Sequence, residues 1–141
     1  MTPTYDPSNI FAKILRGEIP STRVYEDDAV VAFMDVMPQA DGHTLVMPKA
    51  ASRNLLDADP KTFAPLMAAV QRIARAVKAA FNADGVTVIQ FNEPAAGQTV
   101  FHLHLHVIPR FDGVPLKPHT GKMEEASVLQ ANAEKIRKAL R

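Results

Sequence analysis

A run of alternating histidine and apolar residues constrains the fold of this chain more than any other feature. Residues 100–109 read VFHLHLHVIP, with His102, His104 and His106 at every second position. Because side chains alternate between the two faces of a β-strand, the pattern predicts a strand with apolar residues on one face and three imidazoles on the other. A single histidine at such a position is usually incidental. Three in register favour a site that uses imidazole chemistry near neutral pH.

Length and charge limit the architecture and the partners. The chain has 141 residues, 47% of them hydrophobic and 22% charged, as in ordinary globular proteins. This length predicts a single domain over residues 1–141. Sixteen basic and fifteen acidic side chains give a formal net charge of +1, which provides no general attraction to nucleic acid or to an anionic membrane. We therefore expect neither as a partner.

The cellular location is predicted from what the sequence lacks. There is no cysteine, which excludes disulfides and thiolate zinc sites and is compatible with a reducing compartment. The stretch 1–7 has neither the basic start nor the apolar run of a signal peptide. No window approaches the ~20 apolar residues of a membrane span. We expect a cytoplasmic protein.

The spacing of apolar residues predicts the other elements. A short helix capped by Ser8 is expected to end at Gly17 and Pro20. Period-two patterns between turn residues predict strands at Arg23–Glu26, Ala29–Asp35, His43–Pro48 and Val86–Asn92. Longer helices are expected from near Thr62 to near Asn82 and from about Glu124 to Leu140. The predicted fold class is α+β, with an antiparallel sheet of about five strands, one long helix, a short N-terminal helix and a C-terminal helix.

Three further features of the sequence are not assigned to a functional site. Arg72, Arg75 and Lys78 lie opposite the apolar side of the long helix and are interpreted as a solvated face. His119 lies in the loose stretch after the histidine strand and is predicted to be a surface residue. The C-terminal helix has a narrow apolar face, and the sequence leaves open whether it packs on its own sheet or on another subunit.

The pattern His-φ-His-φ-His-φ-φ, in which φ is apolar, resembles the signature of the histidine triad (HIT) family of nucleotide hydrolases and transferases. Other stretches are similar to family segments in the same order: Ile10–Pro20, Phe33–Ala40, Gly42–Lys49 and Ala95–Phe101. The resemblance covers about residues 9–110, which are expected to form the core of a HIT-like fold. Residues 111–141 are then a C-terminal extension.

The resemblance implies a role for each histidine. His104 would attack the α-phosphorus of a nucleotide and form a covalent nucleotidyl-histidine that water then hydrolyses. For this it must be neutral, with its proton on the nitrogen that faces away from phosphorus. His102 and His106 would flank the phosphate, His106 bonding a non-bridging oxygen and His102 orienting the nucleophile. His43 would complete the catalytic group as a proton relay.

The resemblance also implies how the nucleotide is bound. Asp35 would accept hydrogen bonds from both ribose hydroxyls. The base slot would be lined by Ile10, Phe11, Ile14, Phe33 and Leu45, although Ile10, Ile14 and Leu45 taken alone are expected to be core residues. Val36 is also expected to bind substrate. The phosphate and leaving-group side would consist of Asn92, Gly97, Gln98 and Thr99, with N–H groups of the Gly97 loop facing the phosphate.

Two departures from the family pattern affect these expectations. Some relatives carry cysteines near the start that help to bind a structural zinc, whereas this chain has Ala12 in that segment; no metal and no cofactor are expected. Relatives often have glycine after the loop asparagine, whereas this chain has Asn92-Glu93-Pro94. Because Pro94 fixes its own φ and restricts Glu93, the loop is expected to differ in shape.

The leading expectation is a hydrolase that cleaves the bond between the α-phosphate of a nucleoside 5′-monophosphate, of the purine AMP type, and its leaving group. A purine nucleoside phosphoramidase and a dinucleoside polyphosphate hydrolase are the two forms considered. A different class is a non-catalytic nucleotide-binding or metal-binding protein. Two alternate histidines can ligate one zinc, but the third lies about 13 Å from the first along a flat strand. The resemblance further implies a homodimer formed through the long helix and an edge strand.

Overall fold

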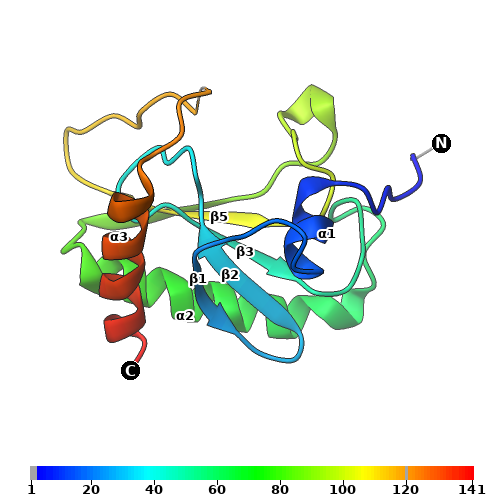
Figure 1. Ribbon diagram of the computed structural model, residues 1–141, viewed down its shortest axis with the longest axis horizontal. Helices are drawn as coiled ribbons and strands as arrows, with labels where there is room; N and C mark the ends of the chain where they lie inside the picture. Colours follow the sequence, from blue (N-terminus) through cyan, green and yellow to red (C-terminus); the bar gives the residue numbers. More distant parts are fainter. Residues whose placement is uncertain (1–2, 120) are drawn as a thin grey trace.

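The computed structural model describes residues 3–119 and 121–141. An antiparallel sheet of five strands, in the order β1-β2-β3-β5-β4, forms the centre of the molecule (Figure 1). The strands are β1 (Arg23–Glu26), β2 (Val30–Met34), β3 (Thr44–Pro48), β4 (Gly85–Ile89) and β5 (Leu105–Arg110). The helices are α1 (Ile10–Leu15), α2 (Phe63–Ala80) and α3 (Ala126–Ala139), with short 3-10 turns η1 (Pro60–Thr62) and η2 (Pro94–Ala96). The predicted fold class is confirmed.

The order of the strands brings distant segments together. β1, β2 and β3 form a meander with short connections, and β5 then inserts between β3 and β4. In this register Phe33 pairs with Leu45, and Leu45 pairs with His106. Directly paired residues project from the same face of a sheet. These three side chains, one from each central strand, therefore share a face.

The two faces of the sheet are covered differently. On one face α2 buries Leu66, Val70, Ile73 and Val77 against the strands. On the other face α1 contributes Phe11 and Ile14 to a second apolar cluster, which continues into β2 and β3. Because both faces are covered, β2 and β3 are buried along their whole length and read as continuous apolar runs.

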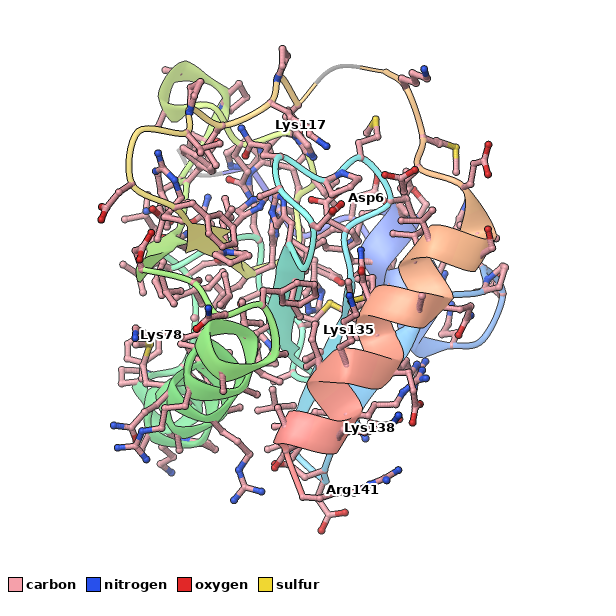
Figure 2. The ribbon with its side chains drawn as sticks, turned by 90° about the vertical axis from the view of Figure 1, so that its left-hand side faces the viewer. Asp6, Lys78, Lys117, Lys135, Lys138 and Arg141 are labelled. Carbon is pink, nitrogen blue, oxygen red and sulfur yellow. The ribbon has the colours of Figure 1, made fainter. Side chains whose placement is uncertain are left out.

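The C-terminal helix packs on its own chain. α3 contacts α2 and β1, and it buries Leu129, Ala133 and Ile136 in the α2 side of the core. The Arg137 guanidinium also donates to the carbonyl of Arg23 on β1, at 2.6 Å from Nη2. Figure 2 shows α2 and α3 side by side, with Lys78, Lys135, Lys138 and Arg141 at the surface of these two helices. The C-terminal helix, whose packing partner the sequence left open, therefore packs on its own chain.

The basic face of the long helix is confirmed, since Arg72, Arg75 and Lys78 are all exposed. Among the residues that the structure describes, no helix is both long and apolar enough to cross a membrane.

Several predicted boundaries need correction. Asn9, and not Ser8, caps α1: Asn9 Oδ1 accepts from the Ala12 N–H at 2.9 Å, while Ser8 bonds to Asp6. β4 ends at Ile89 and not at Asn92, because Gln90 and Asn92 bond to each other through their side-chain amides. The long helix is preceded by η1, and α3 is shorter than predicted by a residue or two at each end.

The largest correction concerns the histidine run. The strand begins only at Leu105, so His102 and His104 precede it in an irregular stretch. There the N–H of Leu103 donates to the carbonyl of Ser52 at 3.0 Å, away from the sheet. The alternation survives in part: Leu103, Leu105 and Val107 contribute to the α2 side of the core. Phe101 does not, because its ring lies against the Arg53 guanidinium.

Candidate active site

Four histidines converge on the face of the sheet that α1 covers. His106 lies on β5, His43 directly precedes the neighbouring β3, and His102 and His104 lie just before β5. The ring centroids of His104 and His106 are 5.1 Å apart, and those of His43 and His106 are also 5.1 Å apart. All four residues are buried, His104 and His106 each retaining 8% exposure.

The proton of His104 is placed by a backbone carbonyl. Nδ1 of His104 lies 2.6 Å from the carbonyl oxygen of His102. A carbonyl oxygen only accepts, so Nδ1 must carry the hydrogen. In the neutral ring this leaves Nε2 with a free lone pair. His104 is thereby arranged as a nucleophile or base through Nε2.

A second chain of hydrogen bonds sets the protons on His43 and His106. The backbone N–H of Gln39 donates to His43 Nδ1 at 3.1 Å, so the proton of neutral His43 is on Nε2. His43 Nε2 lies 2.9 Å from His106 Nδ1 and therefore donates to it. The proton of His106 is then on its own Nε2, where it is available to an acceptor in the site.

His102 lies deeper than the other members of the triad. Its Nε2 donates to the carbonyl of Pro48 at 2.8 Å, and its Nδ1 accepts from the Tyr5 hydroxyl at 2.8 Å. Both ring nitrogens are thus used inside the protein and the residue is fully buried. The expectation that His102 flanks the phosphate does not fit this arrangement. An orienting role does fit, since its carbonyl bonds His104.

Burial keeps these rings neutral. Desolvation lowers the pKa of His43 to about 4, against a partly compensating attraction from the Asp35 carboxylate. It lowers the pKa of His106 to about 3, with the neighbouring rings of His104 and His43 acting in the same direction. The pKa of His104 is also lowered by burial, and its bond to the His102 carbonyl opposes this. A neutral imidazole is the form that attacks or accepts.

Asp35 lies at the edge of the histidine cluster. It follows β2 and is only 4% exposed. Oδ1 accepts from the Met37 N–H at 2.8 Å, and Oδ2 is 3.4 Å from His43 Nε2. His119 Nε2 approaches both oxygens, at 3.2 Å from Oδ1 and 3.1 Å from Oδ2. The surface position predicted for His119 is correct for its partly exposed ring, but its contact with Asp35 was not predicted.

The residues expected to hold a base divide into two groups. Phe11, Ile14, Phe33 and Leu45 belong to one buried cluster, and the Phe11 ring packs edge-on against His104 with a centroid distance of 4.8 Å. Ile10 and Val36 are instead 53% and 41% exposed. Apolar side chains that project into solvent beside a buried apolar cluster can contact a flat apolar ligand.

The loop before the triad differs from the expectation. Gln98 is buried and uses its whole amide inside the protein: Nε2 donates to the carbonyls of Arg53 and Val100, and Oε1 accepts from the N–H of Glu93. The N–H groups of Gly97 and Gln98 donate to the carbonyls of Pro94 and Glu93. These groups build the loop and are not free to meet a phosphate.

Thr99 and Asn92 lie in the same loop. Within the described part of the chain, the exposed Thr99 has no hydrogen bond from its N–H or its hydroxyl. The Asn92 side chain accepts from the N–H of Leu55 and bonds Gln90. Of the residues expected on the phosphate side, Thr99 alone therefore keeps both its donors available.

The departure at Glu93-Pro94 has a structural consequence. Glu93 adopts a φ of +75°, which is unusual for a residue with a side chain. Its carboxylate accepts two bonds from the Arg53 guanidinium, at 2.8 and 3.0 Å, and one from Asn54. This pairing holds the loop in place where relatives often have glycine.

Residues 16–113 match the model of the HIT domain family. The chain belongs to the HIT family. An uncharacterized HIT-like protein of Mycobacterium tuberculosis is 43% identical over 81% of this chain and 79% of its own length. The structure of a HIT-like protein of Bartonella henselae, described as involved in cell-cycle regulation, is 60% identical with a TM-score of 0.94, over 97% of this chain and 99% of that one.

A third relative carries an activity in its name. An adenylylsulfatase of Arabidopsis thaliana is 38% identical over 72% of this chain, which spans 51% of the length of that protein. Membership of the HIT family supports nucleotide binding and hydrolase chemistry for the chain. It does not specify the substrate.

Three residues of the site lie close enough together to be compared with a metal centre. Ligand atoms of Asp35, His43 and His106 all lie within 4.8 Å of one another, a spacing that a zinc ion could bridge. However, the Gln39 N–H occupies Nδ1 of His43, so its Nε2 carries a proton and has no lone pair to donate. These three residues therefore fit a hydrogen-bonded relay better than a metal centre.

Some of the site could not be found from the sequence. Tyr5 contacts His102 across 97 positions, and His119 contacts Asp35 across 84. Tyr5 lies outside any element, and His119 lies in the extension beyond the family resemblance. No periodic pattern marks either residue.

Proposed function

We propose that this HIT protein hydrolyses the bond between the α-phosphate of an AMP-type purine nucleotide and its leaving group, through a covalent intermediate on His104. The contact between His104 Nδ1 and the carbonyl of His102 is the observation that carries this proposal. It leaves the lone pair of Nε2 free in a ring that burial keeps neutral. Nucleophilic catalysis requires this combination.

In the first step, Nε2 of His104 attacks the α-phosphorus, and the bond from phosphorus to the leaving group breaks. The electron pair of that bond goes to the leaving group, which takes up a proton from solvent. The attacking His104 ring gains positive charge, which the carbonyl of His102 stabilises through the Nδ1 hydrogen. In the second step, water attacks the same phosphorus and releases a proton to solvent, and the bond to Nε2 breaks. The electron pair returns to His104, and the nucleoside monophosphate is released.

The neighbouring residues would stabilise the phosphoryl group. His106 has its Nε2–H available, because its Nδ1 accepts from His43, and we assign it to a non-bridging oxygen. Thr99 offers a free N–H and hydroxyl on the loop side. Donors fixed before the reaction can stabilise developing charge on phosphorus at little reorganisation cost. His43 acts through His106, and His102 positions His104.

The nucleoside half of the proposal rests on Asp35 and the apolar cluster. The carboxylate would accept from both ribose hydroxyls, and Phe11, Phe33 and Leu45, with the exposed Ile10 and Val36, would contact the purine. The relative named an adenylylsulfatase supports an adenylyl group as the part recognised. We favour phosphoramidates as substrates over dinucleoside polyphosphates.

The test is a quenched reaction with adenosine 5′-phosphoramidate, followed by mass analysis of the tryptic peptides. One tryptic peptide, residues 79–110, holds His102, His104 and His106, so the adduct is located by fragmenting this peptide. We expect an adenylyl adduct on His104. His104→Ala should lose at least ~10³-fold in kcat, as nucleophile removal typically does, and should still bind AMP. Full activity in that variant, or an adduct on another histidine, would refute the mechanism.

A substrate panel separates the two enzymatic forms. The wild-type protein is assayed with the phosphoramidate and with diadenosine tetraphosphate at equal concentrations. A higher kcat/KM for the phosphoramidate is expected. The reverse order would assign the protein to polyphosphate cleavage, and binding of AMP without turnover of any member would indicate a non-catalytic nucleotide-binding protein.

We also propose a homodimer through β4 and α2. β4 is an edge strand of the sheet, and its Val88 and Ile89 are 42% and 38% exposed. Met67 on α2 is 49% exposed. An unpaired edge with apolar residues is suited to association with a second copy. Light scattering at micromolar concentration should give twice the mass of the chain, and Val88→Asp should reduce it; a wild-type monomer contradicts the proposal.

A further inference from the structure

His119 is hydrogen-bonded to Asp35, the carboxylate that the proposed function assigns to the ribose hydroxyls. Its Nε2 lies almost equally far from the two oxygens of Asp35, at 3.2 and 3.1 Å. A carboxylate only accepts, so the Nε2–H of His119 is shared between both oxygens. The two acceptors that a pair of ribose hydroxyls would need are therefore already engaged by one donor of the chain itself.

The backbone on either side of His119 is fastened to the loop that follows Asp35. The N–H of Lys117 donates to the carbonyl of Gln39 at 2.9 Å, and the N–H of Glu124 donates to the carbonyl of Val36 at 2.8 Å. The Gln39 side chain also reaches the carbonyl of Lys117. These contacts hold the imidazole close to Asp35, which gives an intramolecular ligand a high effective concentration.

The imidazole can leave without disturbing the catalytic histidines. Its side chain is 32% exposed, against 5% for Asp35, so it has an open side towards solvent. Its ring centroid is 5.8 Å from that of His43 and 6.1 Å from that of His106. Among residues 3–119 and 121–141, both hydrogen bonds of its ring go to Asp35. Displacement of His119 thus breaks the contact with Asp35 and leaves the bond between His43 and His106 in place.

We propose that His119 is a built-in competitor for the ribose hydroxyls, bonded to Asp35 in the free protein and displaced when a ribonucleotide binds. The inference rests on the proposed nucleotide function. Two hydroxyl donors, one for each carboxylate oxygen, replace the single shared N–H. A ligand without these hydroxyls has nothing to offer Asp35 and leaves His119 where it is.

The competition has a consequence for selectivity. The cost of displacing His119 falls only on ligands that engage Asp35, so the residue weakens the binding of ribonucleotides and not of analogues that lack the hydroxyls. Removing His119 should therefore increase the preference for AMP over 2′,3′-dideoxy-AMP. Removing a residue that bonded the ribose hydroxyls would lower this preference, and removing one that contacted a part shared by both ligands would leave it unchanged.

The experiment is calorimetric titration of wild-type protein and His119→Ala with AMP and with 2′,3′-dideoxy-AMP. Because the hydrogen bond between the partly exposed His119 and the buried Asp35 no longer has to be broken, the variant should bind AMP about five-fold more tightly, which corresponds to about 1 kcal/mol. Its affinity for dideoxy-AMP should be unchanged. Lys122→Ala, an exposed change in the same stretch, serves as the matched control and should bind both ligands as the wild type does.

A second variant tests whether a gain in AMP affinity comes from losing the N–H donor or from a general loss of stability. His119→Gln keeps an N–H donor, so its gain in AMP affinity should be smaller than that of His119→Ala. Because the ligand-free protein loses the contact with Asp35, the melting temperature of His119→Ala should fall by only about 2–5 °C, and that of His119→Gln by less. Equal AMP affinity in wild type and His119→Ala, or weaker binding by the variant, overturns the competition while the nucleotide function stands. Absence of AMP binding by every protein overturns both.

Discussion

The carbonyl oxygen of His102 lies 2.6 Å from Nδ1 of His104, so these two members of the triad are joined through the backbone of one and the ring of the other. A substitution of the His102 side chain leaves this carbonyl in the chain. The imidazole of His102 acts indirectly. It bonds Pro48 and Tyr5 and so fixes the path of the backbone that carries the carbonyl. The triad thus combines one unbonded lone pair, on Nε2 of His104, with a ring that supports the backbone, His102, and a ring that keeps an N–H donor, His106.

Tyr5→Phe tests this support from the N-terminal side. The change removes the hydroxyl that donates to His102 Nδ1 and leaves a buried acceptor unpaired, which should cost about 1–2 kcal/mol of unfolding free energy. The His102 bond to Pro48 persists, so kcat should fall by less than ten-fold. Urea unfolding and steady-state kinetics measure the two effects. A loss of activity as large as that of His104→Ala would mean that Tyr5 takes part in the chemistry.

The buried histidines predict a loss of stability in mild acid. Their pKa values are lowered in the folded protein, to about 4 for His43 and about 3 for His106, whereas the unfolded chain takes up these protons near pH 6.5. As the pH falls from 6.5 towards 4, the unfolded state binds more protons and is favoured, by about 1.4 kcal/mol per pH unit for each histidine.

Urea unfolding at pH 7.5, 6 and 5 measures this dependence. His43→Asn removes one titrating ring and should give a shallower decline, by about one proton per molecule. Lys122→Ala, a change at an exposed residue that does not titrate between pH 5 and 7.5 in the unfolded chain, should follow the wild type. A wild-type stability that is constant between pH 6.5 and 5 would contradict the burial argument.

Local patterns predicted the elements well where one period and clear turn residues coincide. Arg23–Glu26 was predicted with its observed bounds, since the Asp27-Asp28 pair ends it sharply. The helix cap was misplaced by one residue because Ser8 and Asn9 are both good caps, and only the bond from Ser8 to Asp6 decides between them. Period-two spacing could not show that the Leu103 N–H bonds to Ser52, so that the strand begins only at Leu105.

The sequence predicted which residues meet in the site better than it predicted the role of each residue. His43, His104, His106 and Asp35 do meet, because register places neighbouring strands side by side. The free Nε2 of His104 depends on a carbonyl two residues away, which no residue type reveals. Gln98 is a polar residue in a predicted phosphate loop. Its side-chain amide nevertheless bonds the backbone carbonyl of Arg53 and the backbone N–H of Glu93, so it does not face a phosphate.

Gly42→Ala should be strongly destabilising. Gly42 has a φ of +93°, and an added Cβ would lie 2.5 Å from Cε2 of Phe81. The left-handed backbone costs about 1–2 kcal/mol for a residue with a side chain, and the clash adds about 1–3 kcal/mol. Gly113→Ala is the matched control, because its φ is +75° and nothing lies within 4 Å of the new methyl group.

Denaturant midpoints of the two variants give the comparison. Gly113→Ala should lose only the backbone contribution. Gly42→Ala should lose more, and because Gly42 precedes His43 it should also lower kcat. Equal losses of stability in the two variants would show that Phe81 moves aside without cost.

The loop before the triad predicts opposite behaviour for two adjacent residues. Gln98→Glu keeps the shape of a buried side chain but replaces an amide donor with a carboxylate that faces the carbonyls of Arg53 and Val100. The oxygen at the Oε1 position keeps its donors from Glu93 and Asn54, but the oxygen that replaces Nε2 would be buried against two carbonyls without a donor, which should cost about 2–4 kcal/mol. Thr99→Ala, at an exposed position, should leave stability unchanged and lower kcat/KM for the phosphoramidate, because Thr99 is assigned to the phosphoryl group. Thermal denaturation and steady-state kinetics on both variants separate the roles. If Gln98→Glu is as stable as the wild type and selectively impaired in turnover, the amide of Gln98 contacts substrate and the loop must open to allow it.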